Sequence, residues 1–132
     1  TFGNVDSLRG FTIADYNGTK FLVTPSDNAG WAVLENIDLT DITSVATRAG
    51  WLGAPKAGYT IELRLDAADG KVLASFDFPA QKDKGANPQP SFLIMDSKFE
   101  AVTDGKLHNV FIVSRPKGNE SEKVYLGYME FK

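Results

Sequence analysis

Cysteine is absent from this chain of 132 residues, and its absence removes several classes of protein from consideration. Without cysteine the chain can form no disulfide framework, no thiolate zinc site and no cysteine nucleophile. Both a cytosol and a bacterial exterior are compatible with such a composition. Cysteine usage therefore leaves the compartment open.

Long apolar runs are also lacking. No stretch approaches the roughly 20 apolar residues that a helix needs to span a bilayer. Residues 1–10 have neither the basic start nor the apolar centre of a signal peptide. We therefore expect no insertion into a membrane, and the first residues do not indicate where the protein is located.

An excess of charge of one sign is missing as well. The chain has 14 Lys and Arg against 17 Asp and Glu, for a net charge of −3, and the two signs are interspersed. Proteins that bind nucleic acid normally concentrate positive charge on one face. We therefore expect no nucleic-acid partner.

Alternation of apolar and polar residues is the dominant pattern that is present. In residues 59–65 (YTIELRL) the two kinds alternate at every position, as in a strand with one buried and one solvated face. Asp66 and Gly70 bound a turn, after which residues 72–78 resume the alternation. These residues predict a β-hairpin.

Similar patterns predict strands along the rest of the chain. Their ranges are Gly10–Ala14, Thr19–Val23, Trp31–Leu39, Thr43–Arg48, Ser91–Asp96, Leu107–Ser114 and Lys123–Phe131. Residues 96–103 are too short for more than one helical turn, and residues 81–90 form a polar insertion. Eight or nine short strands without alternating helices predict an all-β fold, an antiparallel β-sandwich (jelly roll), as a single domain over residues 1–132.

Three stretches in the same order resemble the family 6 carbohydrate-binding modules. The first is residues 30–42 (GWAVLENIDLTDI), and the second combines residues 59–66 (YTIELRLD) with residues 69–73 (DGKVL). The third combines residues 105–113 (GKLHNVFIV) with residues 124–131 (VYLGYMEF). The resemblance extends over about residues 19 to 132.

The resemblance implies a β-jelly roll of secreted bacterial enzymes that binds polysaccharide through aromatic residues, often with a structural calcium ion. This chain departs from the family pattern at several positions. The opening Glu-Ala-Glu triplet is absent, and Gly127 stands where the family has an aspartate that helps to hold calcium. Phe92 is the only aromatic residue near the family's sugar-stacking tryptophan, and Tyr125 replaces an asparagine. A calcium site is therefore expected to be weak at most, and no metal ligand is assigned.

Successive loops of an antiparallel arrangement alternate between the two ends of a sandwich. One end should hold both tryptophans, the longest insertions and several polar residues, whereas the other should hold tight Asp/Gly turns. Sugars are bound by flat aromatic faces together with planar polar groups. The candidate ligand-binding residues are Trp51, Trp31, Phe92, Arg115, Asn119 and Tyr125.

Structural roles compete with ligand binding at most of these positions. Trp31 fits a core or rim residue better than a binding platform, and Phe92 fits an apolar plug. Trp51 stands between Gly50 and Gly53 without a clear period, so we expect a loop residue, for which ligand contact and a structural role are equally good interpretations. Tyr125 and Tyr128 are expected on opposite faces of the last strand.

The sequence contains no recognisable catalytic motif. His108 is the only histidine, and no nucleophile motif or metal-binding histidine pair accompanies it. A structural hydrogen bond is its expected role. Asp66 and Asp69 have the spacing of a turn and not of a calcium loop. The chain is therefore not expected to be an enzyme.

The leading functional hypothesis is a non-catalytic carbohydrate-binding module of a larger secreted bacterial protein, extracellular or periplasmic. Its partner would be a polysaccharide or an oligosaccharide, and it would be linked to other domains. The alternative is a structural or protein-interaction β-sandwich that has lost sugar binding. The fold alone cannot decide between them, because jelly rolls serve many functions.

Overall fold

A computed structural model describes residues 7–24, 30–51, 55–80, 91–118, 120 and 122–132. They form ten strands: β1 (Ser7–Arg9), β2 (Thr12–Tyr16), β3 (Thr19–Val23), β4 (Trp31–Asp38), β5 (Ser44–Trp51), β6 (Gly58–Leu65), β7 (Val72–Pro79), β8 (Ser91–Lys98), β9 (Leu107–Pro116) and β10 (Tyr125–Phe131). Within these ranges there is no helix of the length and apolarity needed to cross a membrane.

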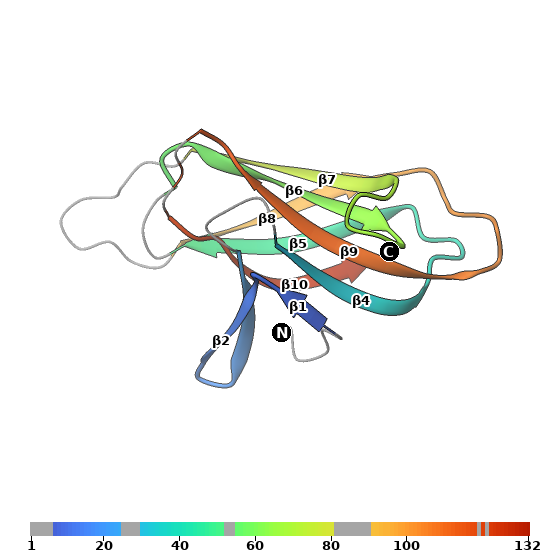
Figure 1. The fold of residues 1–132 in the computed structure, drawn as a ribbon, viewed down its shortest axis with the longest axis horizontal. Coiled ribbons are helices and arrows are strands. Elements are labelled where there is room, and N and C mark those ends of the chain that lie inside the picture. Colours follow the sequence, from blue (N-terminus) through green and yellow to red (C-terminus); the bar gives the residue numbers. More distant parts are fainter. Residues whose placement is uncertain (1–6, 25–29, 52–54, 81–90, 119, 121) are drawn as a thin grey trace.

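The strands form two antiparallel sheets of five strands that face each other (Figure 1). One sheet has the order β1-β4-β9-β6-β7 and the other the order β2-β3-β10-β5-β8. The predicted β-sandwich is therefore confirmed, and each predicted strand is present. β1 is an additional strand that the sequence did not predict, because it has only three residues, too few for an alternation to be recognised.

The core lies between the sheets and follows from the alternation. Tyr59, Ile61 and Leu63 of β6 are almost completely buried. They belong to one cluster with Val45 and Leu126 of the opposite sheet. The polar residues between them point away from the core, as expected for strands with one buried face.

A β-bulge in β10 changes which residues share a face. Tyr125 is paired with Gly50 and Tyr128 with Arg48, so three steps along β10 correspond to two along β5. Since Gly50 and Arg48 are two residues apart, they point to the same side of the sheet, and so do Tyr125 and Tyr128. The prediction that these tyrosines lie on opposite faces is wrong, because an inserted residue shifts the period of two.

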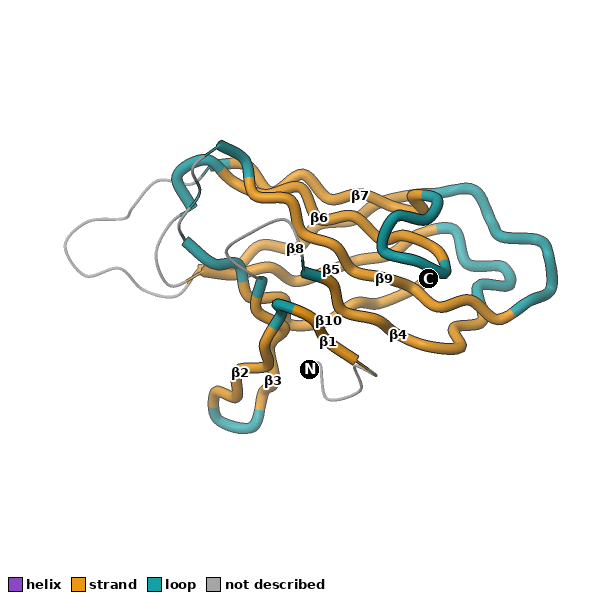
Figure 2. The backbone as a smooth tube through the Cα atoms, viewed as in Figure 1, coloured by secondary structure: helices purple, strands orange, loops and turns teal. Residues whose placement is uncertain are grey.

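The β2–β3 hairpin projects from the body of the sandwich (Figure 2). Its turn contains Asn17 and Gly18, with φ angles of 54° and 85°, as a two-residue hairpin turn requires. Asp15 Oδ1 accepts a hydrogen bond from the Gly18 N–H at 2.9 Å. β3 pairs with β10 at only two positions, Val23 with Tyr125 and Leu22 with Leu126. The tip of the hairpin is therefore supported mainly by its side chains.

Candidate functional site

A hollow of about 430 Å³ opens on the outer face of the sheet β2-β3-β10-β5-β8. The aromatic side chains that line it are Tyr16, Phe21, Trp51, Phe92 and Tyr125. Asn17, Thr19 and Arg48 complete the lining. The hairpin contributes four of these eight residues, so the hollow lies between the hairpin and the sheet.

The sheet register creates the space. Gly50 lies between Tyr125 on one neighbouring strand and Phe92 on the other. Side chains directly opposite each other on a sheet share a face. Because glycine has no side chain, the two aromatic residues flank a gap, and this gap belongs to the hollow.

A second glycine allows Phe21 to lie close to the sheet. A Cβ atom on Gly127 would lie 3.4 Å from Phe21 Cε1 and 3.7 Å from Arg48 Cβ. Gly127 is the position where the family resemblance implies a calcium-binding aspartate. The ring of Phe21 occupies this side of the strand, so the residues present do not fit a calcium ion here. Among the described residues, no group of three or more Asp, Glu or His side chains could hold a metal ion.

Aromatic contacts hold the lining together. Phe21 and Phe92 are stacked with ring centroids 5.9 Å apart, and Tyr16 lies 6.1 Å from Tyr125. Such pairs add about 0.5–1.5 kcal/mol to the effect of burial. Burial, together with the neighbouring hydroxyl of Tyr16, raises the pKa of Tyr125. The hydroxyl of Tyr125 is therefore a neutral donor and acceptor at the edge of an apolar surface.

Among the described residues that line the hollow, only Arg48 is charged. Its guanidinium carbon lies 4.2 Å from the centroid of the Phe92 ring, within the range of a cation–π contact. Phe92 is 39% exposed and faces the hollow, so its expected role as an apolar plug is not what the structure shows. Phe92, Tyr125 and Trp51 are the predicted site residues that line the hollow.

Trp51 is not the loop residue that was predicted. It ends β5, is only 9% exposed and packs edge-on against Phe78 at 5.5 Å between the sheets. The alternation that buries Val45 and Ala49 continues to Trp51, and the neighbouring glycines concealed this period in the sequence. Trp51 contributes to the lining of the hollow, but most of its ring is buried between the sheets.

Trp31 and Arg115 belong to the other sheet, away from the hollow. Trp31 begins β4 and contacts Phe111 at 5.5 Å, while the buried neighbour Ala32 faces the core. Arg115 Nε donates a hydrogen bond to Glu62 Oε1 at 2.6 Å. The prediction that both tryptophans contribute to one site is wrong, because they lie in different sheets. Asn119 lies outside the described residues.

Sequence reasoning missed five of the eight lining residues: Tyr16, Asn17, Thr19, Phe21 and Arg48. The Asn-Gly pair at 17–18 is a hairpin signal that could have placed Tyr16 and Phe21 on adjacent strands. The alternation in β5 could have placed Arg48 on the outer face with Gly50. The order of strands in the sheet could not be read from the sequence, and it is this order that brings the hairpin beside β10.

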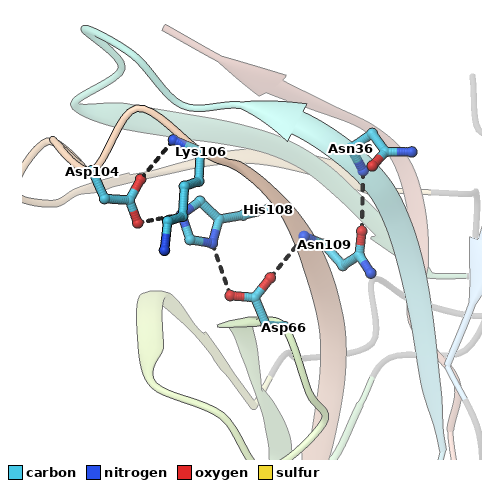
Figure 3. A network of polar contacts seen from close by, with 6 residues as sticks. All are labelled: Asn36, Asp66, Asp104, Lys106, His108 and Asn109. Carbon is cyan, nitrogen blue, oxygen red and sulfur yellow. Dashed lines mark hydrogen bonds and ion pairs between the residues drawn. The ribbon is translucent and has the colours of Figure 1, made fainter.

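Figure 3 shows a separate polar cluster around His108. It lies at the end of β6 and the start of β9, whereas the hollow lies at the end of β5 and the start of β10, so the two are at opposite ends of the sandwich. His108 Nδ1 lies 2.8 Å from Asp66 Oδ2, and Nε2 lies 2.8 Å from Asp104 Oδ2. The hydrogen bond to Asp66 is the main cause that raises the pKa of His108. The hydrogen bond to Asp104 also raises this pKa, whereas burial lowers it. Both ring nitrogens are engaged, which confirms a structural hydrogen-bonding role for His108.

Comparison by sequence finds no matching family model and no matching curated protein. Comparison of the fold finds clear matches. A family 6 carbohydrate-binding module from Clostridium cellulolyticum, solved with xylose, has a TM-score of 0.70 and 15% identity, covering 97% of this chain and 91% of that one. A module from Clostridium stercorarium, solved with cellobiose, has a TM-score of 0.65 and 19% identity, covering 99% and 89%. The chain therefore has the fold of the family 6 carbohydrate-binding modules.

Another match is a glycoside hydrolase family 43 arabinoxylan arabinofuranohydrolase from Bacillus subtilis, with a TM-score of 0.66 and 21% identity. The alignment covers 90% of this chain, but this chain spans only 22% of the length of that enzyme. A carbohydrate-binding module of family 36, with a TM-score of 0.61 and 13% identity, was solved with calcium and xylotriose. Calcium thus occurs in a protein of this fold.

Proposed function

We propose that this protein is a non-catalytic carbohydrate-binding module and that it binds its saccharide in the hollow between the β2–β3 hairpin and β8. The observation that carries the proposal is the lining, in which aromatic faces adjoin a guanidinium and tyrosine hydroxyls. Aromatic faces cover the apolar C–H surface of sugar rings, and planar polar groups bridge adjacent hydroxyls. The hollow offers both kinds of group within one volume.

The structural neighbours support the same class of ligand. Modules of this fold were solved with xylose and with cellobiose, and they match this chain over most of both lengths. We infer a polysaccharide or oligosaccharide as the partner. As part of this proposal, the module acts outside the cell or in the periplasm, as one domain linked to others.

Tyr125→Ala tests the site. Tyr125 flanks the gap above Gly50 and contacts both Tyr16 and Phe21. We expect its loss to weaken binding about tenfold in affinity electrophoresis or calorimetry with soluble xylan and glucan, because a stacking surface is removed. Trp31→Ala is the matched control, since it removes an aromatic side chain from the other sheet.

Binding that is lost with Trp31→Ala and kept with Tyr125→Ala would move the site to the other sheet. Failure of the unaltered protein to bind any member of a broad panel of soluble polysaccharides would overturn the proposal. The protein would then be assigned to the alternative class, a scaffold for protein interactions. Melting temperatures of both variants separate loss of binding from loss of folding.

A further inference from the structure

We propose that Arg48 makes the hollow selective for acidic saccharides and that its guanidinium binds the carboxylate of a uronic acid residue. This inference rests on the proposed function, because it assigns the chemical class of the ligand to the same site.

A comparison of arginines carries the first step. On the other sheet, Glu62 accepts hydrogen bonds from Arg64 and from Arg115, so the charges of these arginines face a carboxylate. Arg48 has no carboxylate within ion-pair distance among the described residues, and its closest described partner is the ring of Phe92. An arginine with a purely structural role would be expected to pair with a carboxylate, as Arg64 and Arg115 do.

The contact with Phe92 leaves the donors of Arg48 available. A guanidinium donates hydrogen bonds from N–H groups in its own plane, whereas a ring beneath its central carbon uses none of them. The contact also restricts the long side chain, which lowers the entropy lost when a ligand binds. A carboxylate is the partner that matches two adjacent donors of this group.

The charges around Arg48 favour an anion on the side of the hollow. The residues directly opposite it are Tyr128 and Ile94, and neither carries a charge. The nearest acidic residues in the register are Glu130 and Asp96, which both pair with Ala46, two residues from Arg48 along β5 and on the side opposite to Phe92. The part of the lining that the structure describes contains no carboxylate, although the whole chain has a net charge of −3.

Matched pairs of ligands test the inference. Each pair consists of an acidic polymer and the same polymer after reduction of its carboxyl groups: glucuronoxylan, β-1,4-glucuronan and alginate. We expect the unaltered protein to bind at least one acidic polymer about tenfold more tightly than its reduced form at low salt. This preference should decrease as salt is added, because the contact is ionic.

Arg48→Gln should abolish the preference, so that the acidic polymer binds no more tightly than its reduced form, because glutamine carries no charge. Arg48→Lys should keep a smaller preference, since it retains the charge and loses the paired donors. Arg115→Gln on the other sheet is the control and should change neither value. Melting temperatures check that each variant is folded.

Equal binding of the acidic and reduced polymers by the unaltered protein would overturn the inference and leave the proposed function intact. A preference that persists in Arg48→Gln would overturn it as well. Tighter binding of a sulfated xylan than of any uronate would overturn the assignment to a carboxylate. If no polymer of either kind binds, the proposed function falls, and this inference falls with it.

Discussion

The outer faces of the two sheets use charge and aromatic side chains in opposite ways. On the sheet β1-β4-β9-β6-β7, arginine charges are neutralised by Glu62, and Lys117 pairs with Asp77. On the sheet β2-β3-β10-β5-β8, aromatic rings surround a hollow and Arg48 faces a ring. Ion pairs between neighbouring side chains stabilise a surface, whereas exposed aromatic rings and guanidinium N–H groups without a carboxylate partner are available to a ligand. This difference is the reason why the proposed binding site lies on the second face.

Substitution of the two tryptophans by alanine gives the largest expected effect on the free energy of unfolding. Trp51 is almost fully buried between the sheets, and truncation of a buried tryptophan costs about 3–5 kcal/mol. We expect Trp51→Ala to lower the free energy of unfolding by about this amount in urea titrations. Trp31→Ala, on the outer face of the other sheet, should cost clearly less. A larger loss for Trp31→Ala would contradict the assignment of Trp51 to the core.

The ion pairs of the first face give a smaller effect. Burial tends to raise the pKa of Glu62, but hydrogen bonds from Arg115 and Arg64 hold it below its usual value. Glu62→Gln should lower the free energy of unfolding by about 1 kcal/mol, since the groups are partly exposed. Saccharide binding should not change. Weaker saccharide binding by the Glu62→Gln variant would contradict the proposal that the first face stabilises the protein and the second face binds the ligand.

The cluster around His108 predicts a dependence of stability on pH. The folded-state pKa of His108 is raised, so its contribution is complete below its unfolded pKa of about 6.5 and is lost as the pH rises through the folded pKa. The pKa values of Asp66 and Asp104 are lowered, so their contribution is present above about 4 and is lost on acidification.

Melting temperatures between pH 4 and 9 would measure this dependence. The difference between the unaltered protein and His108→Gln should be largest between about pH 4 and 6.5 and should shrink above the folded pKa. A difference that stays constant over the whole range would show that the charge on His108 does not stabilise the fold. Saccharide binding should be unaffected by the substitution, because the cluster lies at the end of β6 and the start of β9, at the other end of the sandwich from the hollow.

Chelation gives the smallest expected effect. Because the ring of Phe21 occupies the side of Gly127, we expect EDTA to leave the melting temperature unchanged within about one degree, given that 1 kcal/mol shifts it by several degrees. Added calcium should have equally little effect. A drop of many degrees with EDTA would show that a calcium site exists elsewhere in the chain.

Much of the fold could be predicted because alternation is a local property. Residues 59–65 show which side chains of β6 face the core, and the structure confirms this pattern. Gly127 shows where local reasoning fails, since one inserted residue placed Tyr125 and Tyr128 on the same face. The site could be predicted only in part, because Tyr16 meets Tyr125 through pairing between strands more than 100 residues apart.

The β2–β3 hairpin has a consequence for how the hollow opens. Thr24 exchanges hydrogen bonds with Val124 at the base of the hairpin, but β3 shares only two register pairs with β10. Opening of a weakly anchored segment requires far less free energy than global unfolding. We therefore expect the width of the hollow to follow a local opening of the hairpin that is separate from global unfolding. Amide hydrogen exchange measures this opening. The amide of Phe21 should exchange faster than the amide of Leu63, which lies in the centre of the other sheet.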